Sequence, residues 1–239
     1  MLLSAILCVA AFQGNVAHRS ILVFSKTAGF RHDSIPVGRD ALLDIGIKRG
    51  WAVTFTEDAG VFEPKRLRAF DAVVFLSTTG TILDKKQEKA LVGFIHAGGG
   101  FAGVHAAADC EYDWPWYGQL VGAWFLQHPP QQEAVVKIED TTSPVTQGLP
   151  NPWTRKDEWY DYKANPRAKV HVLASLVPTS YSGSKMPDDH PIMWTQEFEG
   201  GRSWYTGMGH TQESYKDPLF LKMIAEGIEW ACGKSKRKV

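Results

Sequence analysis

The sequence predicts an α/β fold with a doubly wound, mostly parallel sheet. Short, continuous apolar runs are typical of strands that are buried on both faces of a parallel sheet. In residues 20–105 such runs alternate with segments whose apolar residues recur at helical spacing, at about thirty residues per strand–helix unit. This alternation favours parallel strands that are joined by right-handed helical crossovers.

The first strand and helix of the alternation open the domain. Residues 21–25 (ILVFS) form the apolar run of the strand, and residues 35–47 carry apolar side chains at three- and four-residue spacing. Asp33 or Ser34 is expected to cap the start of this helix, and Gly50 is expected to end it.

Two strands, a helix and a fourth strand continue the pattern. Residues 52–56 and 72–76 (AVVFL) are predicted to be the second and third strands. Asp84 is placed to cap a helix that extends to the GGG at 98–100, and residues 101–105 follow as the fourth strand.

The second half of the chain is less regular, and an irregular insert rich in tryptophan follows the fourth strand. The expected elements are strands at 134–138 and 170–176, a polar loop at 178–191, a hairpin of 191–197 and 202–206 around an EGG turn, and a closing helix at 219–231.

Length and composition indicate one domain, residues 18–233, followed by a short basic tail at 234–239. The chain has 239 residues, of which 44% are hydrophobic, so it is long enough to bury one sizeable core. It carries 26 basic and 26 acidic residues. This neutral balance provides no long-range attraction for nucleic acid, and no nucleic-acid partner is expected.

Residues 1–17 are predicted to be a secretory signal segment, because their apolar run at 2–12 is too short to span a bilayer as a helix. No transmembrane segment is therefore expected. No Lys or Arg precedes the run and the cleavage site is weak, so a buried N-terminal segment is the alternative. If residues 1–17 are a signal, the protein is expected to be periplasmic or secreted. If they are not, a cytoplasmic protein is the alternative. Loss of the segment leaves Cys110 and Cys232, which make no disulfide framework.

Polar residues follow the predicted strands at their carboxyl ends, where open α/β sheets bind ligands. The segment KTAGFRHDS at 26–34 places Arg31 and His32 after the first strand. An Arg–His pair at this edge suits an anion or a hydroxyl, and a helix-capping loop is the alternative. The hydroxyl-rich STTGT at 77–81 follows the third strand and is interpreted as an ordinary turn.

The segment GVHAA at 103–107 has the pattern of a nucleophile elbow, in which a tight turn from strand to helix lifts one side chain into the site. The lifted residue is His105, which is expected to be exposed at the strand end. Histidine suits proton transfer, metal ligation or hydrogen bonding to a substrate. Simple close packing by Gly and Ala is the alternative, and Cys110 is expected to be structural.

Three later segments place His128, Glu158 and His210 beside aromatic residues or glycine in expected loops. None of these groups lies at a metal-binding spacing such as H-E-x-x-H or C-x-x-C. A metal site would therefore have to be assembled from distant segments.

Tryptophans gather in the irregular region, and their aromatic planes can stack on the apolar faces of sugar rings. At least half of them are expected to fill the core. Residues 113–160 are predicted to form a sugar-facing wall, with at least one of Trp114, Trp116 and Trp159 partly exposed beside the histidines.

The chain resembles the ThuA-like family, named for a trehalose-utilisation protein and related in fold to the class I glutamine amidotransferases. The segments that carry the resemblance are GFRHDSI (29–35), GGGFAGVHAA (98–107), DEWY (157–160) and HPIMWTQEF with GRSWYTGMGHTQESY (190–215). The resemblance covers residues 20–233 and implies a flavodoxin-like sheet and a connection to oxidised-sugar metabolism, through 3-keto disaccharides.

The amidotransferase relatives carry a Cys nucleophile at the elbow. This chain has His105 there, so glutamine hydrolysis by that mechanism is excluded.

The leading hypothesis is an enzyme that acts on a small-molecule carbohydrate, a keto-glycoside, by acid–base chemistry. A 3-keto group acidifies the neighbouring C–H bond, so a positioned base can start isomerisation or elimination. The candidate acid and base groups are His105, Glu158 and His210. The candidate substrate-binding residues are Arg31, His32, His128, Trp114 and Trp159. A divalent metal held by some of the histidines is a variant of this hypothesis, because it would polarise the ketone.

The rival hypothesis is a non-catalytic carbohydrate-binding or accessory domain. Recognition needs only aromatic rings and neutral hydrogen bonders, whereas catalysis needs titratable groups that converge on one reacting atom. A separation of more than about 10 Å among His105, Glu158 and His210 would favour the rival. The sequence leaves the sugar, the bond attacked and the oligomeric state open.

Overall fold

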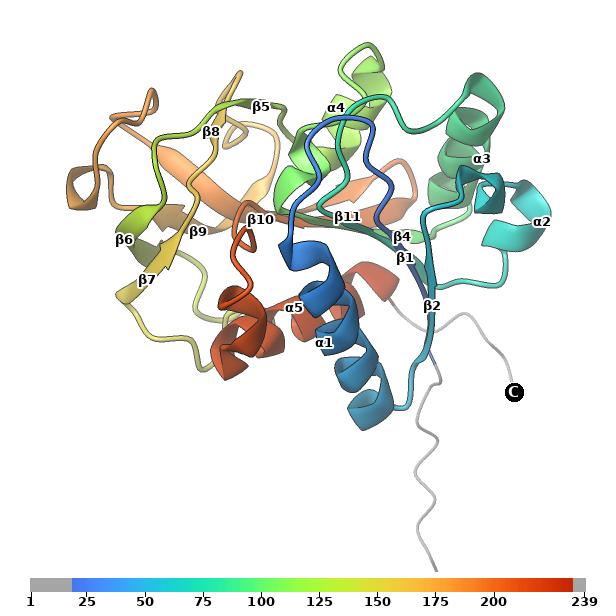
Figure 1. The fold of residues 1–239 in the computed structure, drawn as a ribbon, viewed down its shortest axis with the longest axis horizontal. Coiled ribbons are helices and arrows are strands. Elements are labelled where there is room, and N and C mark those ends of the chain that lie inside the picture. Colours follow the sequence, from blue (N-terminus) through green and yellow to red (C-terminus); the bar gives the residue numbers. More distant parts are fainter. Residues whose placement is uncertain (1–18, 234–239) are drawn as a thin grey trace, which may run out of the picture.

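The computed structural model describes residues 19–233, and a nine-stranded sheet runs through its centre in the order β2-β1-β3-β4-β11-β10-β9-β6-β7 (Figure 1). Five strands form its parallel half: β1 (Ser20–Phe24), β2 (Ala52–Thr56), β3 (Ala72–Leu76), β4 (Gly100–Val104) and β11 (Gly201–Thr206). Their order is the flavodoxin-like one, so the predicted fold class is confirmed. The predicted signal segment and basic tail lie outside the described residues.

Helices cover both faces of the parallel half. They are α1 (Ser34–Arg49), α2 (Pro64–Leu67), α3 (Lys85–His96), α4 (Pro115–Val121) and α5 (Pro218–Cys232). Figure 1 shows α1 and α5 together below the sheet, with α3 and α4 above it. Short 3₁₀ turns occur at Ala59–Val61, His105–Ala108, Pro178–Ser180 and Ser214–Lys216. The sequence predicted α1, α3 and α5 but not the shorter α2 and α4.

The N-termini of α1 and α3 can be compared with the predicted capping residues. Asp84 caps α3 as predicted, because its carboxylate accepts the backbone N–H groups of Lys86 and Gln87. Asp33 occupies the cap position of α1, but its side chain forms no capping hydrogen bond. It accepts a hydrogen bond from Gln212 instead. The predicted cap of α1 is therefore wrong at the level of the side chain.

An antiparallel half continues the same sheet beyond β11. It comprises β10 (His190–Phe198), β9 (His171–Leu176), β6 (Gln132–Ile138) and β7 (Trp153–Asp157). The predicted hairpin is confirmed as β10 and β11, joined through Glu199 and Gly200, which both have positive φ. The strand β7 was not predicted. Neither was the small sheet of β5 (Phe125–Gln127) and β8 (Asp161–Tyr162).

The core lies on both faces of the parallel half, where β3 and β4 are buried along their whole length. The thiols of Cys110 and Cys232 are also buried and unpaired, and burial raises the pKa of each to about 12. None of the helices in residues 19–233 combines the length and the hydropathy that a bilayer span requires.

Because β1, β3, β4 and β11 are parallel, their carboxyl ends meet at one edge of the sheet, and the segments that leave this edge form the candidate site.

Candidate functional site

His105 begins the turn that follows β4, and its backbone has a φ of 50°, which is uncommon for a residue other than glycine. Its side chain is fully buried rather than exposed, so the expectation of an exposed elbow is wrong. His105 Nδ1 lies 2.9 Å from the carbonyl oxygen of Gly207. Since a carbonyl only accepts, neutral His105 carries its proton on Nδ1, and the lone pair of Nε2 faces the site.

Glu158 places one carboxylate among three imidazoles. The residue follows β7 and is almost fully buried. Its Oε2 lies 3.4 Å from His105 Nε2 and 3.0 Å from His210 Nδ1. Its Oε1 lies 3.2 Å from Nδ1 of His128, whose side chain is 40% exposed. Glu158 therefore links the buried His105 and the mostly buried His210 to His128, which solvent reaches.

His210 follows β11 and is held through its backbone. The side chain of Asp157 accepts the N–H groups of Gly209 and His210, at 2.9 and 3.0 Å. This contact fixes the loop that carries the imidazole, and His210 Nδ1 then lies 3.1 Å from His105 Nε2.

His32 completes the arrangement from the segment after β1. Its ring lies edge-on to the rings of His105 and His210, with centroids 4.9 and 5.0 Å away. Its Nδ1 is buried and has no hydrogen-bond partner within residues 19–233. A buried polar atom without a partner costs about 1–3 kcal/mol, so His32 is suited to a ligand that supplies one.

These four side chains form what we call the histidine–glutamate cluster: His32, His105, Glu158 and His210. Each offers one ligand atom, and the four atoms lie within 4.8 Å of one another. They come from segments after β1, β4, β7 and β11. The cluster is thus assembled from distant parts of the chain.

Burial and mutual contact shift the titration of the cluster. Burial, together with the neighbouring His105 and His210, lowers the pKa of His32 to about 3, so His32 is neutral at physiological pH. Burial acts to raise the pKa of Glu158, but hydrogen bonds with His105 and His210 outweigh it and hold that pKa well below its usual range. Burial acts to lower the pKa of His210, but its hydrogen bond with Glu158 outweighs this and raises it. Ionised Glu158 and neutral His32 are both in the form that a metal ion binds.

The spacing of the ligand atoms fits a single small cation. His105 Nε2, Glu158 Oε2 and His210 Nδ1 form a triangle with sides of 3.0, 3.1 and 3.4 Å. Ligand atoms held at about 2.0–2.2 Å from one metal ion are separated by roughly 3.0–3.5 Å in octahedral or tetrahedral geometry. His105 Nε2 can donate a hydrogen bond to Glu158 Oε2 only when the ring carries a second proton; when His105 is neutral, both atoms offer lone pairs, as metal ligands do.

Arg31 and Trp159, which the sequence nominated for substrate binding, are engaged elsewhere. Arg31 is half exposed and forms a two-pronged ion pair with Glu57, at 2.8 and 3.0 Å. Trp159 is fully buried and donates its Nε1–H to the backbone oxygen of Gln132. The prediction that Trp159 stacks on a sugar is therefore wrong. β1 and β2 are neighbouring parallel strands, so the segments that follow them start at the same edge of the sheet, which brings Arg31 and Glu57 within reach of each other.

The predicted tryptophan wall is also wrong for the other two rings. Trp116 donates its Nε1–H to Glu199, in the turn that precedes β11 at the opposite edge of the sheet from His105. Trp114 stacks on Trp116 at 5.1 Å and on Tyr117 at 5.9 Å. Both rings are partly exposed, but they pack against α4 and the β10–β11 turn.

Other aromatic rings surround the histidine–glutamate cluster. Tyr160 lies against His105 with ring centroids 4.1 Å apart, and Phe125 lies against Tyr160 at 4.2 Å. Phe30 contacts His32 edge-on at 4.9 Å and is 66% exposed. The sequence did not single out Phe125, and it assigned no role to Phe30, Asp157 or Tyr160, although these three lie within the quoted motifs GFRHDSI and DEWY.

One family model matches most of the chain. Residues 20–231 match the ThuA family model, which is described as trehalose utilisation. The crystal structure of a ThuA-like protein from Bacteroides uniformis superposes with a TM-score of 0.80 at 22% identity, covering 95% of this chain and 97% of that one. A ThuA-like protein from Parabacteroides merdae gives a TM-score of 0.74 at 20% identity, covering 93% of each chain. These two likenesses show the fold alone. No curated protein matches the chain.

Proposed function

Because the chain belongs to the ThuA family, we propose that it acts on a keto-glycoside or a related oxidised sugar by acid–base chemistry at the histidine–glutamate cluster. The observation that carries the proposal is the convergence of four ligand atoms within 4.8 Å, at the edge where α/β sheets bind ligands. A buried group of this kind, with pKa values shifted in opposite directions, is typical of a functional site.

The proposal includes a divalent metal ion held by the histidine–glutamate cluster. Imidazole nitrogens and one carboxylate are a donor set that suits first-row divalent ions such as Zn²⁺. The hydrogen bond from His105 Nδ1 to Gly207 is of the kind that orients a metal-bound histidine. Such an ion, when bound, polarises a carbonyl group of the substrate.

The chain supplies proton acceptors on the solvent side of the cluster. Glu158 Oε1 and His128 Nδ1 are 3.2 Å apart, and His128 is exposed enough to meet a sugar. A ketone acidifies the C–H bond next to it, so His128, supported by ionised Glu158, is assigned to take that proton. Protonated His128 then returns the proton to the substrate without a covalent intermediate: to the glycosidic oxygen as its bond to carbon breaks, which gives elimination, or to another atom of the enolised ketone, which gives isomerisation.

A panel of 3-keto glycosides and their unoxidised parents, followed by mass spectrometry with and without Zn²⁺, tests this function. Turnover of the keto-glycosides alone is the expected result, and it should be lost in the His128→Gln protein. The surface residue His171, which pairs with Asp140, provides a matched control, since His171→Gln should retain full activity. Saturable binding of sugars without any product would instead support the non-catalytic carbohydrate-binding alternative.

The pH dependence of metal affinity provides a further prediction. His210 must lose a proton before its Nδ1 can bind a metal ion, and its pKa is raised by Glu158. Affinity for Zn²⁺ is therefore expected to fall as the pH drops through that raised pKa, by about tenfold per pH unit for each proton displaced. Isothermal titration calorimetry in buffers of different ionisation enthalpy measures both affinity and proton release. A flat affinity with no proton release would contradict the assignment of His210 as a ligand.

Phe30 is expected to stack on the sugar, since it leaves a large ring in solvent beside His32. The Phe30→Ala change should raise KM for a keto-glycoside by roughly three- to tenfold and leave kcat nearly unchanged, because the ring contributes binding but no proton transfer. Ile47 on α1 is 71% exposed, and Ile47→Ala is the matched control. A fall in kcat with constant KM would argue against a stacking role.

A further inference from the structure

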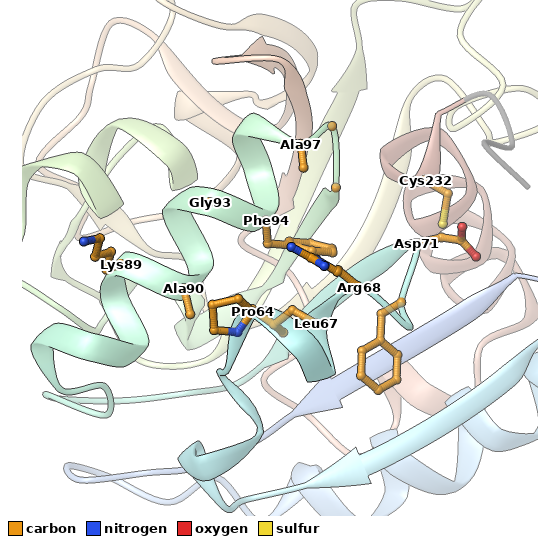
Figure 2. A pocket seen from close by; sticks show the side chains of 13 residues that line it. Pro64, Leu67, Arg68, Asp71, Lys89, Ala90, Gly93, Phe94, Ala97 and Cys232 are labelled. Carbon is orange, nitrogen blue, oxygen red and sulfur yellow. The ribbon is translucent and has the colours of Figure 1, made fainter.

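A second cavity lies at the opposite edge of the sheet from the histidine–glutamate cluster (Figure 2). Its volume is about 440 Å³, within the range of pockets that hold small organic ligands. It is lined by α2, α3, the residues that precede β3 and β4, and the end of α5. The five-residue strands β3 and β4 separate the two sites by about 16 Å. The cavity is thus distinct from the site described above.

The walls of the cavity are mainly apolar. Pro64 and Leu67 on α2 and Ala90 and Phe94 on α3 contribute side chains to it, and Figure 2 shows them gathered between the two helices. The ring of Phe94 packs on the backbone of Gly99, where a Cβ atom would lie 2.4 Å from the ring. The fold therefore holds Phe94 firmly as part of the wall.

Gly93 leaves additional room in this wall. It lies within α3, where glycine is less favourable than alanine because its backbone loses more conformational entropy on folding. A Cβ atom added to Gly93 would meet nothing within 4 Å, so packing of the fold does not require the glycine. The missing side chain instead enlarges the cavity, which is a reason to expect a ligand there.

The charged residues of the cavity favour an anion. Arg68 on α2 and Lys89 on α3 form no salt bridge with any residue in 19–233, whereas Arg66 on the same helix pairs with Glu63. The carboxylate of Asp71 also lines the cavity, but it already accepts the backbone N–H of Ser20 at 2.8 Å. Figure 2 shows Lys89 on the outer side of α3, away from Arg68. Arg68 is therefore the unpaired cation beside an apolar space whose one carboxylate is already engaged.

We propose that this cavity binds an amphipathic organic anion, with its apolar body between α2 and α3 and its carboxylate or sulfonate paired with Arg68. The apolar walls and the space beside Gly93 accommodate the body, and Arg68 selects the charge. This site does not depend on the function proposed for the histidine–glutamate cluster.

Fluorescence titration with anilinonaphthalene sulfonate, followed by displacement, tests the proposal. Naphthoate and octanoate should displace the dye saturably, and the neutral alcohol of naphthoate should bind about fivefold more weakly or worse. Comparison of naphthoate with octanoate shows whether the cavity prefers a flat aromatic body or a flexible chain. Equal binding by naphthoate and its alcohol, or absence of any saturable binding, would overturn the proposal.

Substitutions in the wall locate the binding site. Gly93→Leu fills the space with a good helix former and should weaken naphthoate binding at least about tenfold without lowering Tm. Arg68→Gln should weaken naphthoate binding about two- to fivefold and leave the binding of the alcohol unaffected. Arg66→Gln removes the same charge and is the control, so it should change the binding of neither naphthoate nor the alcohol. Zn²⁺ affinity should stay constant in all three. Unchanged naphthoate affinity in both Gly93→Leu and Arg68→Gln would place the anion elsewhere and overturn the proposal.

Discussion

Replacing Glu158 by glutamine is expected to abolish metal binding and to lower turnover of a keto-glycoside by about a hundred- to ten-thousand-fold. Glu158 supplies the one negative charge of the histidine–glutamate cluster, and its two oxygens contact His105, His128 and His210. An amide of the same shape carries no charge and offers only one acceptor oxygen. The change therefore removes both a metal ligand and the support for the base.

Glu111 provides a matched control for this prediction. It is another buried glutamate, and its Oε1 accepts the backbone N–H groups of Ile82 and Leu83. Glutamine can keep these two bonds through its own oxygen, so Glu111→Gln should retain metal binding and turnover. Calorimetry with Zn²⁺ and thermal melting at the same pH distinguish a lost ligand from a lost fold. Undiminished Zn²⁺ affinity in Glu158→Gln would show that the cluster holds no metal.

The inner strands of the parallel half were predictable because they are buried on both faces. In β1, β3 and β4 this burial produces unbroken apolar runs, and the predicted boundaries differ from the structure by at most one residue. In β7 the inward positions alternate with outward ones and include Arg155 and Asp157, which are buried together. A strand with charged residues on its inner face does not show an apolar pattern, so periodicity alone could not identify it.

The location of the candidate site follows from topology, whereas its contacts do not. His32, His105 and His210 each follow a strand of the parallel half, and strand order brings these ends together. Whether another candidate side chain is free to bind a ligand depends on its contacts with segments that are distant in the sequence. Arg31 is engaged by Glu57 and Trp159 by the backbone of β6, and neither partner is adjacent in the sequence. The sequence therefore predicted the position of the histidines better than it predicted which side chains are free to bind a sugar.

The second large effect is expected for Asp157→Asn, which should lower the free energy of unfolding by about 3–5 kcal/mol. Asp157 is fully buried. Its Oδ1 accepts the N–H of His210, and its Oδ2 accepts the N–H of Gly209 and the hydroxyl of Ser214 and lies 3.4 Å from Arg155. Whichever oxygen the amide group replaces, its N–H₂ would face other donors. Arg155 would also lose its buried counter-ion.

Because Asp157 holds the loop of His210, the same change is expected to weaken Zn²⁺ binding under conditions in which the protein is still folded. Asp217 is the control, since it also faces Arg155, at 3.5 Å, but is partly exposed and caps α5 through its Oδ1. Asparagine caps helices as well as aspartate does, so Asp217→Asn should cost less than about 1 kcal/mol and keep full Zn²⁺ affinity. Urea denaturation measures the first effect, and calorimetry on the folded variants measures the second. If Asp157→Asn were destabilised but bound Zn²⁺ normally, Asp157 would support the fold without positioning His210.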